Sequence, residues 1–217
     1  MKTVFIHPER CIGCKQCEVA CAVEHSDSKS LFWSVFESPA PQARIHAEAG
    51  LWINTSYPNK CRHCNPAPCL ACCPTAAIYR NKTFPDIVLI EARKCIACGM
   101  CAMVCPFDAI TYHTSAAVPE KKVVAVKCDQ CLERQSCGQA PACVEACKVN
   151  ALEFGEVNTL IRAGRVHYAQ SVWSSPGQGA EGPQLPPLVK SWRDWGMAVS
   201  QLNEGLNEEM SEGKKGA

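Results

Sequence analysis

Cysteines are the residues in this chain whose type and spacing could do chemistry. One run of them, residues 95–105, is followed directly by Pro106. Its spacing is C-x2-C-x2-C-x3-C, formed by Cys95, Cys98, Cys101 and Cys105. In this pattern three closely spaced thiolates hold one [4Fe-4S] cube, and the fourth reaches a different cube. The run therefore predicts both a cluster and a partner run elsewhere in the chain.

Three further runs of four cysteines are present. One is also followed by Pro, one repeats the C-x2-C-x2-C-x3-C spacing, and one has eleven residues between its second and third cysteines. Sixteen of the 18 cysteines fall in the four runs, which predicts four [4Fe-4S] clusters. The further runs are formed by Cys11, Cys14, Cys17 and Cys21; by Cys61, Cys64, Cys69 and Cys73; and by Cys128, Cys131, Cys143 and Cys147.

Zinc and disulfides are the alternatives for so many cysteines. Zinc ribbons use two C-x2-C pairs and do not require a third cysteine two residues on or a fourth before Pro. Disulfides require a secretory context. The N-terminus has no apolar stretch of signal-peptide length. Iron-sulfur ligation is the prediction, and the cysteines outside the runs, Cys72 and Cys137, are expected to be small, semi-buried apolar side chains.

Charge and motif content narrow the function. The formal net charge is +1 and basic residues are spread along the chain, so nothing indicates nucleic-acid binding. Ligation by cysteines alone leaves no iron open to a substrate, and the chain has no P-loop and no C-x-x-C-H haem site. The sequence predicts a non-catalytic, cytoplasmic protein with a protein partner.

Short elements must position the cysteines. Residues 73–78 match residues 105–110, and residues 147–152 are a diverged copy in which Lys148 replaces Pro. Hairpins are predicted between residues 77–80 and 87–90, and between residues 110–113 and 123–126. The predicted fold is α+β, with two ferredoxin-like cluster modules built from short helices and small β-hairpins.

An insertion at residues 26–60 separates the first two runs. Its alternating pattern predicts a hairpin of residues 44–47 and 51–54 about Ala49 and Gly50. Phe32, Trp33 and Phe36 are expected to cover the clusters, with surface docking as the alternative.

The C-terminal part changes in composition. Residues 1–170 are predicted to form the polyferredoxin domain, residues 171–187 a Pro/Gly/Ser linker, and residues 188–217 an amphipathic helix. That helix could pack on its own domain, on a partner, or on another copy of the chain. Its predicted docking face is formed by Leu188, Trp192, Trp195, Val199, Leu202 and Leu206.

Residues 3 to about 155 resemble a known family. The stretch from Lys127 to Cys147, with its long gap between cysteines, is especially similar to the fourth motif of four-cluster ferredoxin-like electron-transfer subunits of multisubunit oxidoreductases. Such subunits serve aldehyde:ferredoxin oxidoreductase, formate dehydrogenase, dimethyl sulfoxide reductase, hydrogenase and carbon monoxide dehydrogenase systems. The resemblance implies that the first run pairs with the fourth and the second with the third. The ligand sets would then be Cys11, Cys14, Cys17 with Cys147; Cys128, Cys131, Cys143 with Cys21; Cys61, Cys64, Cys69 with Cys105; and Cys95, Cys98, Cys101 with Cys73.

The predicted function is a relay of single electrons through four [4Fe-4S] clusters, between a catalytic subunit and a second redox partner. The resemblance favours a tungsten or molybdenum aldehyde oxidoreductase as the catalytic partner, with a flavin/NAD subunit or a ferredoxin as the second. Carbon monoxide dehydrogenase, hydrogenase and formate dehydrogenase remain alternatives. A filament or scaffold subunit that self-associates through the C-terminal helix is the alternative of another class.

Overall fold

The computed structural model describes residues 2–51, 55–115, 118, 122–173 and 195. The protein divides into two units, Met1–Arg162 and Ala163–Ala217. All four cysteine runs lie in the first unit. No helix within the described residues has the length and apolar character needed to span a bilayer.

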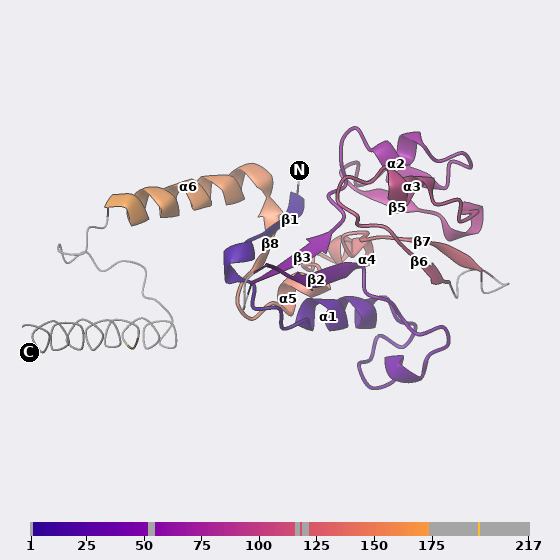
Figure 1. Cartoon of the computed structure of the whole chain (residues 1–217), viewed down its shortest axis with the longest axis horizontal. Coiled ribbons are helices and arrows are strands. Elements are labelled where there is room, and N and C mark those ends of the chain that lie inside the picture. The colour runs from indigo at the N-terminus through magenta and orange to yellow at the C-terminus, as the bar shows by residue number, and fades with distance from the viewer. Residues whose placement is uncertain (1, 52–54, 116–117, 119–121, 174–194, 196–217) are drawn as a thin grey trace, which may run out of the picture. The chain divides into compact units, whose positions relative to one another are not determined.

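Four antiparallel two-stranded sheets form the framework of the first unit (Figure 1). Two of them are the predicted hairpins, in which Ile78 pairs with Ile90 and Thr111 pairs with Val126. The predicted α+β class is therefore confirmed. The paired strands are β1 (Lys2–Ile6) with β8 (Leu152–Glu156), β2 (Ile45–Ala49) with β3 (Ser56–Lys60), β4 (Ile78–Arg80) with β5 (Val88–Ile90), and β6 (Thr111–Thr114) with β7 (Val123–Val126).

The hairpin of the insertion differs from its prediction. Its first strand lies as expected, but the returning strand is β3, not residues 51–54. The backbone N–H of Gly50 donates to the carbonyl of Thr55 at 2.9 Å, which closes the connection between the strands. The sequence of β3, Ser-Tyr-Pro-Asn-Lys, has little strand character, yet Ser56, Pro58 and Lys60 alternate as buried residues. An apolar pattern could not find a strand whose buried positions are polar or Pro.

The pairing of β1 with β8 joins the two ends of the first unit and was not predicted. Strands β4, β6 and β8 each follow one copy of the internal repeat, and β4 and β6 pair with the strand that comes next. After β8 the polypeptide enters helix α6 (Val157–Trp173) instead. Strand β8 therefore pairs with the N-terminal strand, and this brings the first and fourth cysteine runs together.

The helices of the first unit are short, and each lies within a cysteine run or overlaps one. Helix α1 (Gln16–Glu24) continues past Cys21, where Ala22 stands in the place of Pro, and it contacts α5 (Ala142–Glu145). The remaining helices of the first unit are α2 (Pro68–Ala71), α3 (Met100–Met103), α4 (Leu132–Ser136) and α5 (Ala142–Glu145), with 3-10 turns η1 (Pro8–Arg10), η2 (Ser34–Phe36) and η3 (Ala92–Lys94).

Helix α6 spans 17 residues and was not predicted. It ends at Trp173, so the first residues of the predicted linker are helical. The predicted C-terminal helix, including Leu188, Trp192, Val199, Leu202 and Leu206, lies outside the described residues apart from Trp195. Its docking and self-association remain predictions, as do the domain limits.

Candidate metal centres

The four cysteine runs share one backbone conformation. In each, the residue just before the second cysteine has a positive φ, in the left-handed region. In three runs this turns its N–H toward the sulfur of the first cysteine, at 3.4 to 3.5 Å. Such bonds orient the thiolate and stabilise its negative charge. The left-handed residues are Gly13, His63, Ala97 and Gln130, and the bonds run from His63 to Cys61, from Ala97 to Cys95 and from Gln130 to Cys128.

The internal repeat is also visible in the backbone. Three residues after the last cysteine of a run, Ala76, Asp108 and Asn150 have φ values of 50°, 47° and 51°. Each donates its N–H to the carbonyl of that cysteine, at 3.2 to 3.4 Å. The diverged third copy therefore makes the same turn without Pro, and the predicted repeat is confirmed.

One of the predicted ligand sets lines a single cavity. Cys73 comes from the second run and Cys95, Cys98 and Cys101 from the third, and all four border the same space. Ile78 and other apolar side chains complete its wall. The structure thus brings together the three-plus-one combination that the family resemblance implies.

A second set gathers around α1 and α5. Burial raises the pKa of Cys143, and the nearby thiols of Cys128, Cys21 and Cys131 raise it further. Burial likewise raises the pKa of Cys21, with Cys128 and Cys131 again adding to the effect. These mutual effects require the four thiols to lie close together.

In each of the other two ligand sets, the effects on thiol pKa values link three of the four cysteines. Burial raises the pKa of Cys69 to about 11, and among its neighbours Cys61 and Cys105 raise it. Burial raises the pKa of Cys17 to about 11, and Cys11 and Cys14 contribute to the rise. Cys147, the proposed fourth member of the latter set, packs against the apolar cluster that contains Cys17.

The spacing of the thiols fits a cube better than a single ion. Zinc bonded to four thiolates at about 2.3 Å would bring the sulfurs within roughly 4 Å of one another. Across the described residues, the donor group whose atoms all lie within 4.8 Å is His25, Asp129 and Cys131, with one cysteine only. The all-thiolate donors and their wider separation fit [4Fe-4S] cubes. Because burial raises thiol pKa values, bound iron would be what keeps these sulfurs deprotonated.

A hydrogen-bonded network centred on the carboxylate of Asp129 lies beside the ligand set that contains Cys131. Asp129 accepts hydrogen bonds from His25 Nε2 at 3.0 Å, from Arg44 at 2.5 Å and from the N–H of Cys131 at 2.9 Å. Burial alone would raise the pKa of Asp129, but these partners hold it well below its usual range. The Nδ1 of His25 lies 2.7 Å from the carbonyl of Cys21, so the imidazole bridges this carbonyl and Asp129. Sequence reasoning missed this network, since its members are far apart in the chain.

A tyrosine hydroxyl reaches a proposed ligand of the cavity set. Tyr112 lies 3.1 Å from the sulfur of Cys101. Burial raises the pKa of Tyr112, and the contact with Cys101 raises it further, so the hydroxyl keeps its proton. A thiolate has no proton, and the tyrosine must then be the donor. No pattern in the sequence indicated this contact.

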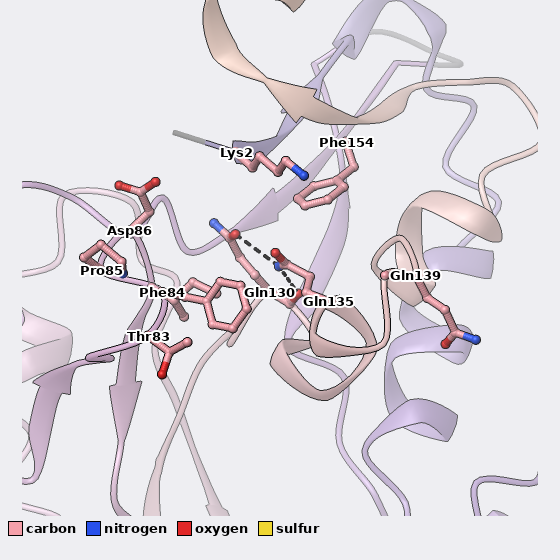
Figure 2. A pocket seen from close by; sticks show the side chains of 11 residues that line it. Lys2, Thr83, Phe84, Pro85, Asp86, Gln130, Gln135, Gln139 and Phe154 are labelled. Atoms are coloured by element: carbon pink, nitrogen blue, oxygen red, sulfur yellow. Dashed lines mark hydrogen bonds between the residues drawn. The ribbon is translucent and has the colours of Figure 1, made fainter.

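Gln130 is locked by a glutamine from helix α4. The amide of Gln135 donates to the carbonyl of Gln130 at 2.7 Å and approaches its side-chain oxygen at 3.5 Å. Figure 2 shows these side chains beside a cavity that Phe84 and Phe154 also line. No cysteine borders this cavity. The contact between Gln135 and Gln130 holds the loop whose N–H donates to Cys128.

Several sequence expectations concern neighbours of the runs. His63 is packed, with its Nδ1 accepting the N–H of Val88 at 3.0 Å, and burial lowers its pKa to about 2. Cys72 is partly buried, as expected. Cys137 is exposed, so its predicted burial is wrong: it follows the short helix α4 at the surface.

The aromatic residues of the insertion do not cover clusters, and that expectation is wrong. Phe32, Trp33 and Phe36 are 72%, 63% and 74% exposed, and they stack on one another rather than on the core. The carboxylate of Glu37 accepts the N–H groups of Asp27 and Ser28, which holds the loop in this outward shape. The docking alternative is the one that the geometry favours.

Comparison with known proteins identifies the class. A family model described as a 4Fe-4S dicluster domain matches residues 53–157. The sequence is 36% identical to an iron-sulfur protein of Rhodospirillum rubrum, over 79% of this protein and 91% of that one. It is 36% identical to the thiosulfate reductase electron transfer subunit PhsB of Salmonella typhi, over 71% and 76%. It is 38% identical to the electron transport protein HydN of Escherichia coli, over 72% and 89%.

This protein belongs to that family of iron-sulfur electron-transfer proteins. The predicted resemblance, the [4Fe-4S] cofactors and the non-catalytic electron-transfer role are confirmed at the level of the family. The particular ligand of each cluster and the particular catalytic partner are matters for proposal.

Proposed function

We propose that this protein is a linear four-cluster relay, and that the sixteen cysteines of the four runs are the ligands in the sets given above. When bound, each [4Fe-4S] cube supplies one-electron transfer. The protein supplies thiolates, hydrogen bonds to sulfur, and apolar walls that keep water away.

The order of the relay is supported by three apolar clusters of side chains. Each contains cysteines from two ligand sets. One joins the Cys95 set to the Cys61 set, a second joins the Cys61 set to the Cys128 set, and a third joins the Cys128 set to the Cys11 set. Adjacent sets therefore share a packed interior, and the order is the Cys95 set, the Cys61 set, the Cys128 set and the Cys11 set. This sharing of cores is the observation that carries the proposal.

The partner that we propose is a molybdenum or tungsten oxidoreductase, with a flavin/NAD subunit or a ferredoxin at the other end. The name of one relative, an electron transfer subunit of thiosulfate reductase, supports a catalytic reductase as the partner. The narrower choice of an aldehyde oxidoreductase remains a prediction. We place the complex in the cytoplasm, where a reducing environment keeps thiols available for cluster assembly.

The docking surface that we propose for the catalytic subunit is the aromatic loop, residues 27–37, which carries Phe32, Trp33 and Phe36. Lys29 at its base contacts Glu133 at 2.8 Å, on the helix that follows Cys131. The loop is thus attached beside the fourth run, and it presents Leu31 and Val35 together with its aromatic side chains to solvent. Exposed apolar patches of this kind mark protein interfaces.

Anaerobic capture of the complex from native cells tests the partner. Molybdenum or tungsten in the complex, with about sixteen irons per copy of this protein after the partner's own clusters are subtracted, is the expected result. Nickel without either metal would reassign the partner to a hydrogenase or a carbon monoxide dehydrogenase. Zinc in place of iron would overturn the relay itself.

A further inference from the structure

A basic residue directly precedes the first cysteine of every run. These residues are Arg10, Lys60, Lys94 and Lys127. Two of them are at the surface and form ion pairs: the side chain of Arg10 is 40% exposed and that of Lys94 is 57% exposed. The other two are buried, with Lys60 1% and Lys127 5% exposed. The same sequence position therefore holds a solvated charge in two runs and a buried one in the other two.

The contacts of the buried ammonium groups, within the described residues, are to main-chain carbonyls. Lys60 Nζ donates to the carbonyl of Cys61 at 3.2 Å. Lys127 Nζ donates to the carbonyl of Cys128 at 3.1 Å and, in a shorter bond, to that of Val88. Neutral carbonyls accept hydrogen bonds from the N–H groups, but they do not neutralise the positive charge. A charge removed from water is costly unless an opposite charge lies near it.

The two ammonium groups lie between two ligand sets. Burial raises the pKa of Cys128 and the charge of Lys60 opposes this rise. Burial also raises the pKa of Cys69, and the charge of Lys127 opposes it. Lys60 directly precedes Cys61 but acts on a sulfur of the Cys128 set. Lys127 directly precedes Cys128 but acts on a sulfur of the Cys61 set. Cys61 and Cys128 pack together in one apolar cluster, which is the junction between the two middle sets of the relay.

The surroundings of this junction are rich in donors. The buried Nε2 of His63 has no hydrogen-bond partner among the described residues, and its Nδ1 accepts from Val88. The charges of both lysines lower the pKa of His63 in addition to burial, so all three groups lie close together. The carboxylate nearby is Asp129, which already holds His25 and Arg44. An additional negative charge at the junction would compensate the positive charges of the two lysines.

We propose that Lys60 and Lys127 are the counter-cations of the two middle clusters and stabilise the reduced state of both. This inference rests on the proposed ligand sets. Reduction adds one electron, and so one negative charge, to an anionic cluster bonded to four thiolates. No covalent bond forms or breaks, and no proton is transferred in this step. A fixed positive charge nearby favours the more negative state and raises the reduction potential.

Potentiometric titration monitored by electron paramagnetic resonance (EPR) tests this in the full-length protein. Lys60→Met and Lys127→Met remove the charge and keep an unbranched side chain, and Lys94→Met removes an exposed charge at the matching position. For each buried lysine, we expect at least one middle cluster to become at least tenfold harder to reduce, which is about 59 mV for one electron. The Lys94→Met variant should leave all potentials in place. Unshifted potentials in both buried variants, or equal shifts in the control, would overturn the proposal.

Lys60→Gln and Lys127→Gln separate charge from hydrogen bonding, because glutamine keeps a donor. Their potentials should fall as those of the Met variants do. Loss of the middle clusters from both Met and Gln variants, with all four retained in Lys94→Met, also supports the charge role. Loss in the Met variants alone, with unshifted Gln variants, would contradict it. Fewer than four clusters in the unaltered protein would contradict the proposed relay, whereas four clusters with unshifted potentials would contradict this inference alone.

Discussion

Replacement of Tyr112 by Phe removes one hydroxyl from a proposed cluster site and leaves the ring in place. The hydroxyl lies 3.1 Å from Cys101 and donates to that sulfur once it is a thiolate ligand. A donor near a cluster stabilises the reduced state more than the oxidised state, because the reduced state carries more negative charge. The variant should therefore have a lower potential at this one cluster.

The size of the shift follows from the hydrogen bond. A hydrogen bond to a charged group contributes about 1.5 to 3 kcal/mol. The added electron spreads over the cube, so roughly a quarter to a half of that energy would differ between the two redox states. The resulting difference, about 0.4 to 1.5 kcal/mol, corresponds to a decrease of about 17 to 65 mV for a one-electron couple.

The assay is an EPR-monitored titration of the purified protein, with Tyr79→Phe as the matched control. Tyr79 lies on β4 of the neighbouring hairpin, with 43% of its surface exposed. We expect one cluster to shift in Tyr112→Phe and none in the control. An unshifted or raised potential in Tyr112→Phe would refute the assignment of Cys101 as a ligand that accepts this bond.

Three other changes have expected outcomes. Asp129→Asn leaves Arg44 without its counter-charge and weakens the acceptor of His25; at a quarter exposure of the Asp129 side chain this costs about 1 to 3 kcal/mol, so guanidinium chloride should release iron faster than from the unaltered protein. Cys73→Ser should remove or convert one cluster, whereas Cys72→Ser should retain all the iron; equal iron content in the two would argue against the assignment. Trp33→Ser combined with Phe36→Ser should weaken binding of the catalytic subunit at least tenfold with potentials unchanged, as measured by calorimetry, and unaltered affinity would exclude the loop as the interface.

The sequence predicted those features that depend on local spacing. The cysteine runs and the repeat that ends in β4 and β6 follow from residues within a few positions of one another. The hairpins of the repeat have adjacent strands, so their partners could be recognised from the pattern alone.

Features that depend on long-range packing could not be predicted. Strand β8 pairs with β1 across almost the whole first unit. Lys60 is buried although it is charged, and Trp33 is exposed although it is aromatic. Their environments are set by segments far away in the chain. From residue type alone, Lys60 would be expected at the surface and Trp33 in the core. Only the tertiary structure therefore reveals the lysine pair and the aromatic loop.

In the proposed relay, sixteen cysteines in four sets hold four [4Fe-4S] clusters in one electron pathway. The most direct test is iron and sulfide analysis of the anaerobically purified protein, combined with integration of the EPR signal after full reduction. We expect about sixteen irons and about four unpaired spins per molecule. Iron for two clusters only, or zinc in the place of iron, would contradict it.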